Sequence, residues 1–171
     1  MRAFLALWPP EPVRRALFAW GQACRAAAGG RLAGYENLHA TLAFLGEIAP
    51  DRLASLATLV REAAGRRFEL VFDEVGYWPH NRIVYAGATE MPVTLSQLAS
   101  ELRLLLAHAG FRTEERPYRA HVTLLRAARK APAGICVEPL HWPVDGIVLM
   151  ESIHGEGGLA YRTVERWTLA H

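Results

Sequence analysis

Two histidine–threonine pairs are the residues of this 171-residue chain with the clearest capacity for chemistry. They lie in two copies of one tetrad, His39-Ala40-Thr41-Leu42 and His121-Val122-Thr123-Leu124. Histidine titrates near neutral pH, so two imidazoles that face one reacting centre can act as general base and general acid. A threonine hydroxyl beside each imidazole can donate to an oxygen on which negative charge develops. The pattern therefore indicates proton transfer around an anionic transition state.

Both tetrads lie in runs that are typical of strands, Leu38–Leu45 and Ala120–Leu125. Because residues i and i+2 share one face of a strand, each histidine should point the same way as its threonine. The intervening apolar residues should then face the core. A single copy would be better explained as the polar face of a half-exposed strand. Two copies in matching surroundings favour a functional site.

The surroundings match because the same elements precede both tetrads. An apolar strand comes first, and a helix follows that begins near a proline, whose missing N–H costs nothing in a first helical turn. In the first half we expect a strand at Ala3–Leu7 and a helix from Pro12 to about Ala28; in the second half, a strand at Ile83–Gly87 and a helix from Pro92 to about Ala109. A strand–helix–strand unit used twice can form two lobes that face one another across a cleft.

The remaining elements follow from periodicity and from turn residues. We expect a helix over Asp51–Ala64, a strand over Phe68–Val75, a turn over Gly76–Asn81, a basic loop over Arg126–Pro132, strands at Ile135–Val137, Gly146–Ser152 and Arg162–Leu169, and a hairpin tip at Gly155–Gly158.

Composition is that of an ordinary globular protein, with 51% apolar residues and a length that suits a single domain. No apolar run has the length of a transmembrane helix, and the apolar segment after Arg2 is too short for a signal peptide. Cys24 and Cys136 show no metal-ligand spacing and are expected to be reduced thiols. We therefore expect a soluble cytoplasmic protein.

The formal net charge is only +2, which argues against broad, nonspecific binding to duplex nucleic acid. Lys130 is the sole lysine, and all the other basic side chains are arginine. Arginine suits phosphate because of its planar fork, but the bias can equally reflect genome composition. A local basic patch for one RNA end or nucleotide remains compatible with these numbers.

The tetrads and their flanks resemble the 2H phosphoesterase superfamily, and more closely its RNA 2′,3′-cyclic phosphodiesterases, also called 2′-5′ RNA ligases of the LigT/ThpR type. The resembling segments are Asn37–Glu47, Gly76–Gly87 and Gly110–Arg126, with Arg2–Ala6 and Tyr161–Leu169 at the two ends. The resemblance thus covers nearly the whole chain. It implies a bilobal α+β fold in which two mainly antiparallel sheets line a central cleft with helices outside.

The resemblance also implies an activity, the opening of 2′,3′-cyclic phosphate ends of RNA to 2′-phosphates, with a reversible 2′-5′ ligase activity. It assigns His39 as general acid to the departing 3′ oxygen and His121 as general base to the attacking water. It matches Arg126 to a phosphate-contacting arginine, while Thr41 and Thr123 are expected to donate to the phosphoryl oxygens. Residues 1–171 are expected to form one domain that acts as a monomer, without a metal, a cofactor, a membrane or a protein partner.

Two other functions stay open: a phosphodiesterase for another cyclic or 2′-5′-linked nucleotide, and a binding module for nucleotides or RNA ends without turnover. The roles of three further residues also stay open. Phe44 and the turn around Trp78 could stack on a base, although core packing suits Phe44 better, and Arg82 could lie on the surface or at the rim of the cleft. The five histidines outside the tetrads are expected to be solvated or structural: His80, His108, His141, His154 and His171.

Overall fold

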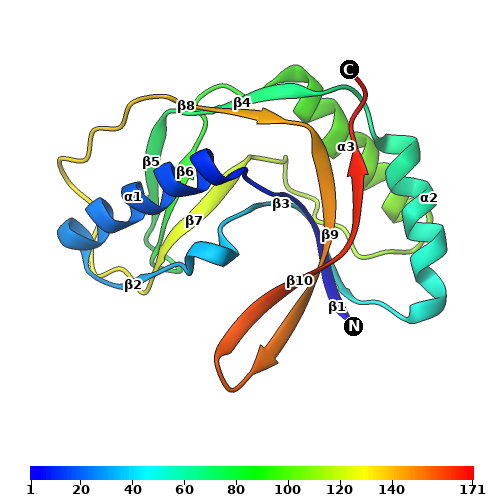
Figure 1. The fold of residues 1–171 in the computed structure, drawn as a ribbon, viewed down its shortest axis with the longest axis horizontal. Coiled ribbons are helices and arrows are strands. Elements are labelled where there is room, and N and C mark those ends of the chain that lie inside the picture. Colours follow the sequence, from blue (N-terminus) through cyan, green and yellow to red (C-terminus); the bar gives the residue numbers. More distant parts are fainter.

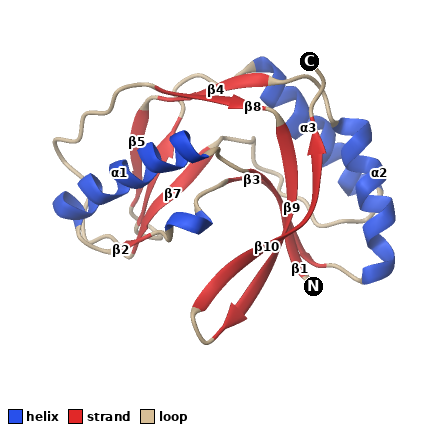
Figure 2. Cartoon of the chain, in the orientation of Figure 1, coloured by secondary structure: helices blue, strands red, loops and turns tan.

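Two antiparallel four-stranded sheets carry the two tetrads in the computed structural model, which describes residues 1–171 (Figures 1 and 2). The first sheet has the strand order β10-β9-β1-β3 and the second has the order β2-β7-β6-β5. The strands of the first sheet are β1 (Arg2–Leu7), β3 (Ala40–Glu47), β9 (Gly146–Gly155) and β10 (Gly158–Thr168). Those of the second sheet are β2 (Arg31–Leu32), β5 (Glu74–Trp78), β6 (Ile83–Gly87) and β7 (His121–Arg126). The expected α+β architecture with two lobes is confirmed.

The helices are α1 (Glu11–Ala28), α2 (Leu53–Ala63) and α3 (Val93–His108), and short 3-10 turns lie at Tyr35–Asn37 and Pro50–Arg52. Each helix buries one stripe of side chains at helical spacing, as Leu95, Leu98, Leu102 and Leu106 do in α3. The helix expected from Asp51 thus begins as a 3-10 turn and continues as α2. None of the three helices is long and apolar enough to cross a membrane.

In each strand–helix–strand unit, the helix contacts the sheet of the other unit. α1 connects β1 to β3 of the first sheet but packs against β7 of the second, while α3 connects β6 to β7 of the second sheet but contacts β3 of the first. Gly21 permits the close approach of α1, because a Cβ atom there would lie 2.8 Å from Cδ1 of Leu32. In Figure 1, α1 accordingly crosses the second sheet, and α2 and α3 lie together beyond the first. One cluster of 35 buried residues therefore draws on both halves.

A third, two-stranded sheet joins β4 (Phe68–Phe72) to β8 (Leu140–Val144) and arches over the top of the molecule in Figure 1. Its inner side chains include Phe72 and Trp142, whose ring centroids are 6.0 Å apart. Both rings are buried. Through these two rings the third sheet belongs to the large core of 35 buried residues.

Several expected boundaries are wrong. Ile135–Val137 forms no strand; the strand lies at Leu140–Val144 instead, where Pro143 is tolerated because β8 is an edge strand. The strand expected over Phe68–Val75 is divided at Asp73 into β4 and β5, which pair in different sheets. Gly76–Trp78 belongs to β5 because it pairs with β6, so the turn is confined to Pro79–Arg82.

The two tetrads also differ slightly from expectation. His39 lies one residue before β3, whereas His121 begins β7. Val122 and Leu124 are buried as expected, while Leu42 is only partly buried. The hairpin tip expected at Gly155–Gly158 is confirmed between β9 and β10.

Candidate active site

His39 is held by hydrogen bonds from both of its ring nitrogens. Its Nδ1 lies 2.7 Å from the carbonyl oxygen of Asn37, and its Nε2 lies 3.0 Å from Oγ1 of Thr41. A carbonyl oxygen can only accept, so Nδ1 carries the proton and donates. In the neutral ring, Nε2 therefore accepts from the Thr41 hydroxyl. The bond to Thr41 confirms that the histidine and threonine of the first tetrad share a face.

Three aromatic rings surround the His39 imidazole. The Trp8 indole stacks on it with 5.4 Å between centroids, and Phe4 lies against it at 4.9 Å. Tyr161 of β10 meets it edge-on at 5.1 Å. Phe4, Ala6 and Trp8 are spaced by two residues, which places them on one face of β1 and its extension. The imidazole consequently occupies an aromatic pocket with little access to water.

This burial lowers the pKa of His39 from its ordinary 6.5 to about 4, because the charged ring loses hydration. The hydrogen bond to the Asn37 carbonyl opposes the shift. The positive charges of Arg126 and His121 add to it, which requires both groups to lie within electrostatic range of His39. His39 is therefore neutral at physiological pH before any ligand binds.

His121 repeats the backbone arrangement of His39 on the second sheet. Its Nδ1 donates to the carbonyl oxygen of Arg119 at 3.0 Å, so each histidine is oriented by the carbonyl two residues before it. Unlike His39, His121 has no protein partner for Nε2. Its second nitrogen is thus unprotonated in the neutral ring and free to meet a ligand.

Two stacked aromatic rings flank His121. Trp78 and Tyr85 lie 4.0 Å apart at 25°, and both present an edge-on contact to the imidazole, with centroid distances of 4.8 and 6.0 Å. Gly76 leaves room for this stack, because a Cβ atom there would lie 2.1 Å from the Tyr85 ring. Trp78 therefore packs against the second histidine, while its expected stacking on a base stays a prediction.

The two sheets bring these groups together because β3 and β7 are in contact. Thr123 lies opposite Tyr85 in the register of β7 with β6, while His121 lies opposite Gly87. Arg126, the last residue of β7, has an exposed side chain without an acidic partner, and its charge acts on both His39 and Tyr161. Burial raises the pKa of Tyr161, and Arg126 opposes that shift. One region thus holds two imidazoles, two threonine hydroxyls and an unpaired guanidinium.

The five other histidines are exposed, as expected, and His141 pairs with Glu69. No group of three or more His, Cys, Asp or Glu side chains is arranged to hold a metal ion. The sequence did not reveal the aromatic residues Phe4, Trp8, Tyr85 and Tyr161. The alternation of Phe4 and Trp8 on one strand face was a usable signal, whereas nothing near Tyr161 connects it to a histidine more than a hundred residues away.

Comparison with known proteins shows the family to which the chain belongs. The family model described as LigT like Phosphoesterase matches residues 7–85 and 87–161, and each segment contains one tetrad. The chain therefore belongs to the LigT-like phosphoesterases of the 2H phosphoesterase superfamily.

The similar proteins include an RNA 2′,3′-cyclic phosphodiesterase of Escherichia coli, which is 33% identical over 98% of this chain and 96% of its own length. Another, from Thermus thermophilus, bears the same name and is 35% identical over 99% of this chain and 90% of its own length. The structure of E. coli LigT with 3′-AMP superimposes with a TM-score of 0.88 at 31% identity, covering 99% of this chain and 98% of that one.

Proposed function

We propose that this protein hydrolyses 2′,3′-cyclic phosphate ends of RNA to 2′-phosphates by general acid–base catalysis. The observation that carries the proposal is the paired orientation of His39 and His121, each with Nδ1 fixed by the carbonyl two residues earlier. The unpaired charge of Arg126 lies within range of His39. The name borne by the E. coli and T. thermophilus relatives supports the same substrate class.

The reaction needs one proton taken and one proton given. We assign His121 as the general base, because its Nε2 is free to accept a proton from water. The resulting hydroxide oxygen forms a bond to phosphorus while the bond from phosphorus to the ribose 3′ oxygen breaks. His39 gives its proton to that departing oxygen, and the phosphate remains on the 2′ oxygen.

His39 must gain a proton before it can act as the acid, although its pocket holds it neutral. A bound phosphodiester anion favours the imidazolium and offsets the positive charge of Arg126, so substrate binding raises the pKa of His39. Once Nε2 is protonated, it can no longer accept from Thr41. The Thr41 hydroxyl is then free to donate to a phosphoryl oxygen.

Thr123 and Arg126 complete the contacts to the phosphate. Thr123 shares the site face of β7 with His121, and its hydroxyl can donate to the second phosphoryl oxygen. The guanidinium of Arg126 can donate two parallel hydrogen bonds to an anion. We also propose that residues 1–171 act as one domain, because its single large core draws on both halves.

The same geometry supports transfer of the phosphoryl group to an alcohol in place of water. If the 5′-hydroxyl of a second RNA replaces water, its oxygen bonds to phosphorus, the 3′ oxygen leaves, and a 2′-5′ linkage results. The proton balance is identical, with His121 taking the hydroxyl proton and His39 protonating the 3′ oxygen. We propose this joining activity as a secondary property of the site.

The direct test is to incubate the protein with adenosine 2′,3′-cyclic phosphate and to separate adenosine 2′- and 3′-phosphates by chromatography. We expect the 2′-phosphate to accumulate. Exclusive formation of the 3′-phosphate would contradict the assignment of the leaving oxygen. A ligand that binds but is recovered unchanged would instead support a non-catalytic binding module.

A further inference from the structure

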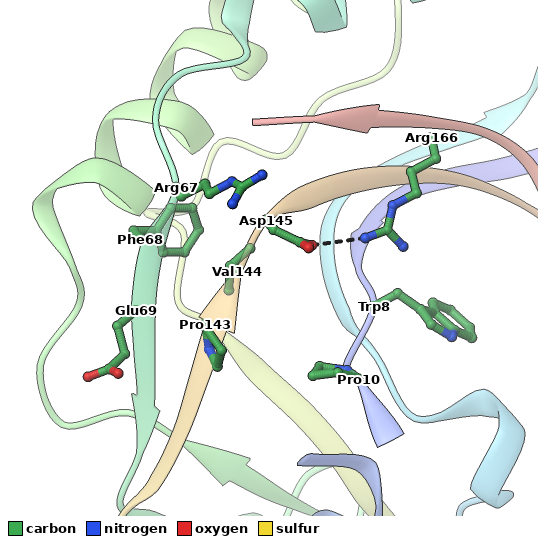
Figure 3. Close-up of a pocket in the computed structure, with 9 residues that line it drawn as sticks. All are labelled: Trp8, Pro10, Arg67, Phe68, Glu69, Pro143, Val144, Asp145 and Arg166. Atoms are coloured by element: carbon green, nitrogen blue, oxygen red, sulfur yellow. Dashed lines mark hydrogen bonds and ion pairs between the residues drawn. The ribbon is translucent and has the colours of Figure 1, made fainter. Parts of the chain in front are cut away.

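A cavity of about 510 Å³ lies next to the aromatic pocket of His39 (Figure 3). It is lined by residues that follow β1, by residues in or next to β4 and β8, and by one residue of β10: Trp8, Pro10, Arg67, Phe68, Glu69, Pro143, Val144, Asp145 and Arg166. Trp8 belongs to both places, since its indole stacks on His39 and also lines the cavity. The cavity and the pocket of His39 therefore share one wall, the Trp8 indole.

Strand register shows that the cavity continues one face of the first sheet. Ala6 lies opposite Thr41 on one side and opposite Val148 on the other, and Val148 lies opposite Arg166. Directly opposed residues point to the same face of a sheet. Arg166 in the cavity and Thr41 at the site thus project from one surface, and Trp8 follows β1, one of the two strands that lie between them.

Two arginines line the cavity, and only one of them is paired with a carboxylate. Asp145 accepts from Arg166 at 2.9 Å, and Glu69 pairs with Nδ1 of His141 at 2.9 Å. Arg67 is exposed and has no acidic partner. Figure 3 shows its guanidinium projecting beside Phe68, with the Arg166–Asp145 pair across the cavity. An anionic ligand would meet Arg67 without first displacing a carboxylate.

The volume and the lining suit a nucleotide unit. Ligand sites commonly enclose roughly 300–1,000 Å³ and combine apolar walls with a few polar groups. Proteins that hold single-stranded RNA place aromatic rings against bases and basic side chains against the backbone. Trp8 and Phe68 supply rings, and Arg67 supplies the charge.

We propose that this cavity binds the nucleotide immediately 5′ to the one that bears the cyclic phosphate, with Arg67 contacting its backbone phosphate. The proposal rests on the proposed function and narrows it. The preferred substrate is an RNA chain of at least two nucleotides rather than a mononucleotide. Arg67 is then a specificity-determining residue that does not touch the reacting phosphorus.

The test compares adenosine 2′,3′-cyclic phosphate with a trinucleotide that ends in the same group. In the wild-type protein, we expect kcat/KM for the trinucleotide to exceed that for the mononucleotide by roughly tenfold, the value of one well-placed contact. Arg67→Gln should bring this ratio close to one. It should also reduce the slope of log kcat/KM against log salt for the trinucleotide by about 0.7, as expected for one lost contact to single-stranded phosphate.

Arg103→Gln is the matched control, because Arg103 is an exposed arginine on α3, away from the cavity lining. It removes the same charge and should leave both the ratio and the salt slope unchanged. An equal loss in the two variants would overturn the proposal, since it would reflect overall charge. A ratio that stays the same in Arg67→Gln would overturn it as well.

Binding of a fluorescent trinucleotide with a terminal 2′-phosphate, followed by anisotropy, separates this proposal from the proposed function. If the wild-type protein hydrolysed neither substrate but Arg67→Gln still weakened trinucleotide binding about tenfold, the subsite would stand and the activity would not. Unchanged binding in Arg67→Gln would contradict the subsite whatever the turnover.

Discussion

The imidazole of His39 lies nearly parallel to the indole of Trp8, with 7° between the ring planes and 5.4 Å between the centroids. His121, by contrast, meets its aromatic neighbours edge-on. The tetrads are equal in sequence pattern, yet they place their histidines in different environments. A stacked, desolvated imidazole is held neutral, whereas the more accessible one keeps a free Nε2. The two histidines are therefore suited to different roles.

Removing either imidazole should reduce hydrolysis of a 2′,3′-cyclic nucleotide. His39→Ala and His121→Ala are each expected to lower kcat by about 10²–10⁴, the usual contribution of one general acid–base group. The exposed His154 offers a control, since His154→Ala should retain wild-type turnover. Steady-state kinetics gives kcat for each variant, and circular dichroism checks that both variants are folded. Near wild-type activity in either tetrad variant would rule out a two-histidine mechanism.

Burial of His39 should make stability depend on pH. The pKa of His39 is about 4 in the folded protein and near 6.5 when unfolded, so the unfolded chain binds the proton first as the pH falls. The contribution of His39 to the free energy of unfolding is fully present above pH 6.5 and declines as the pH falls from 6.5 to 4. Between about pH 7 and about pH 4.5 the loss is about 2–3 kcal/mol.

Urea unfolding of the wild type and of His39→Phe at these two pH values isolates the contribution, because the other groups titrate alike in both. The phenyl ring fits the aromatic pocket and cannot be protonated. The pH-dependent loss of unfolding free energy should accordingly be smaller in the variant. Equal losses in the two proteins would show that His39 is not desolvated in solution.

Trp8 should control both the protonation of His39 and its orientation. Trp8→Ala opens the pocket to water, so the pKa of His39 should rise toward its ordinary value, while kcat should fall about tenfold through lost positioning. Trp8→Phe keeps a stacking ring and should restore most of both properties. NMR titration of the His39 ring protons measures the pKa. A tenfold loss of kcat without any change in that pKa would mean that Trp8 acts by another route.

Gly76 should be indispensable for the stack beside His121. Gly76→Ala places a methyl group where the Tyr85 ring lies, and the displaced ring can no longer pack on Trp78. Crowding of this kind costs about 1–3 kcal/mol in stability, and activity should fall with the disturbance of His121. At Gly65 an added methyl group would meet nothing within 4 Å, so Gly65→Ala is the matched control. Thermal unfolding and kcat are measured for both variants. A Gly76→Ala protein as stable and as active as Gly65→Ala would contradict the prediction.

Hydrolysis should survive chelation. The residues that converge at the site are imidazoles, hydroxyls and a guanidinium, and they include no carboxylate or thiolate cluster with metal-ligand geometry. Activity measured after dialysis against EDTA should equal that of the untreated protein. Loss of activity in EDTA, with recovery on adding a divalent cation, would show that a metal ion takes part.

The sequence by itself determined the features that depend on neighbouring residues. The alternation around His121 decided which side chains face the core, and the repeated order of strand, proline and helix predicted α1 and α3 within a few residues. Both are local properties, because a strand repeats every two residues and a helix about every 3.6. The recurrence of His-x-Thr then indicated where the candidate site lies.

Only the tertiary structure decided what surrounds each histidine. Tyr161 reaches His39 because β9 pairs with both β1 and β10, and α1 packs on the sheet opposite to the one whose strands it connects. The sequence also failed to predict β8, since pairing with β4 outweighs the presence of Pro143. Contacts between distant segments depend on burying the surface of the whole chain, and no short window of sequence contains that information.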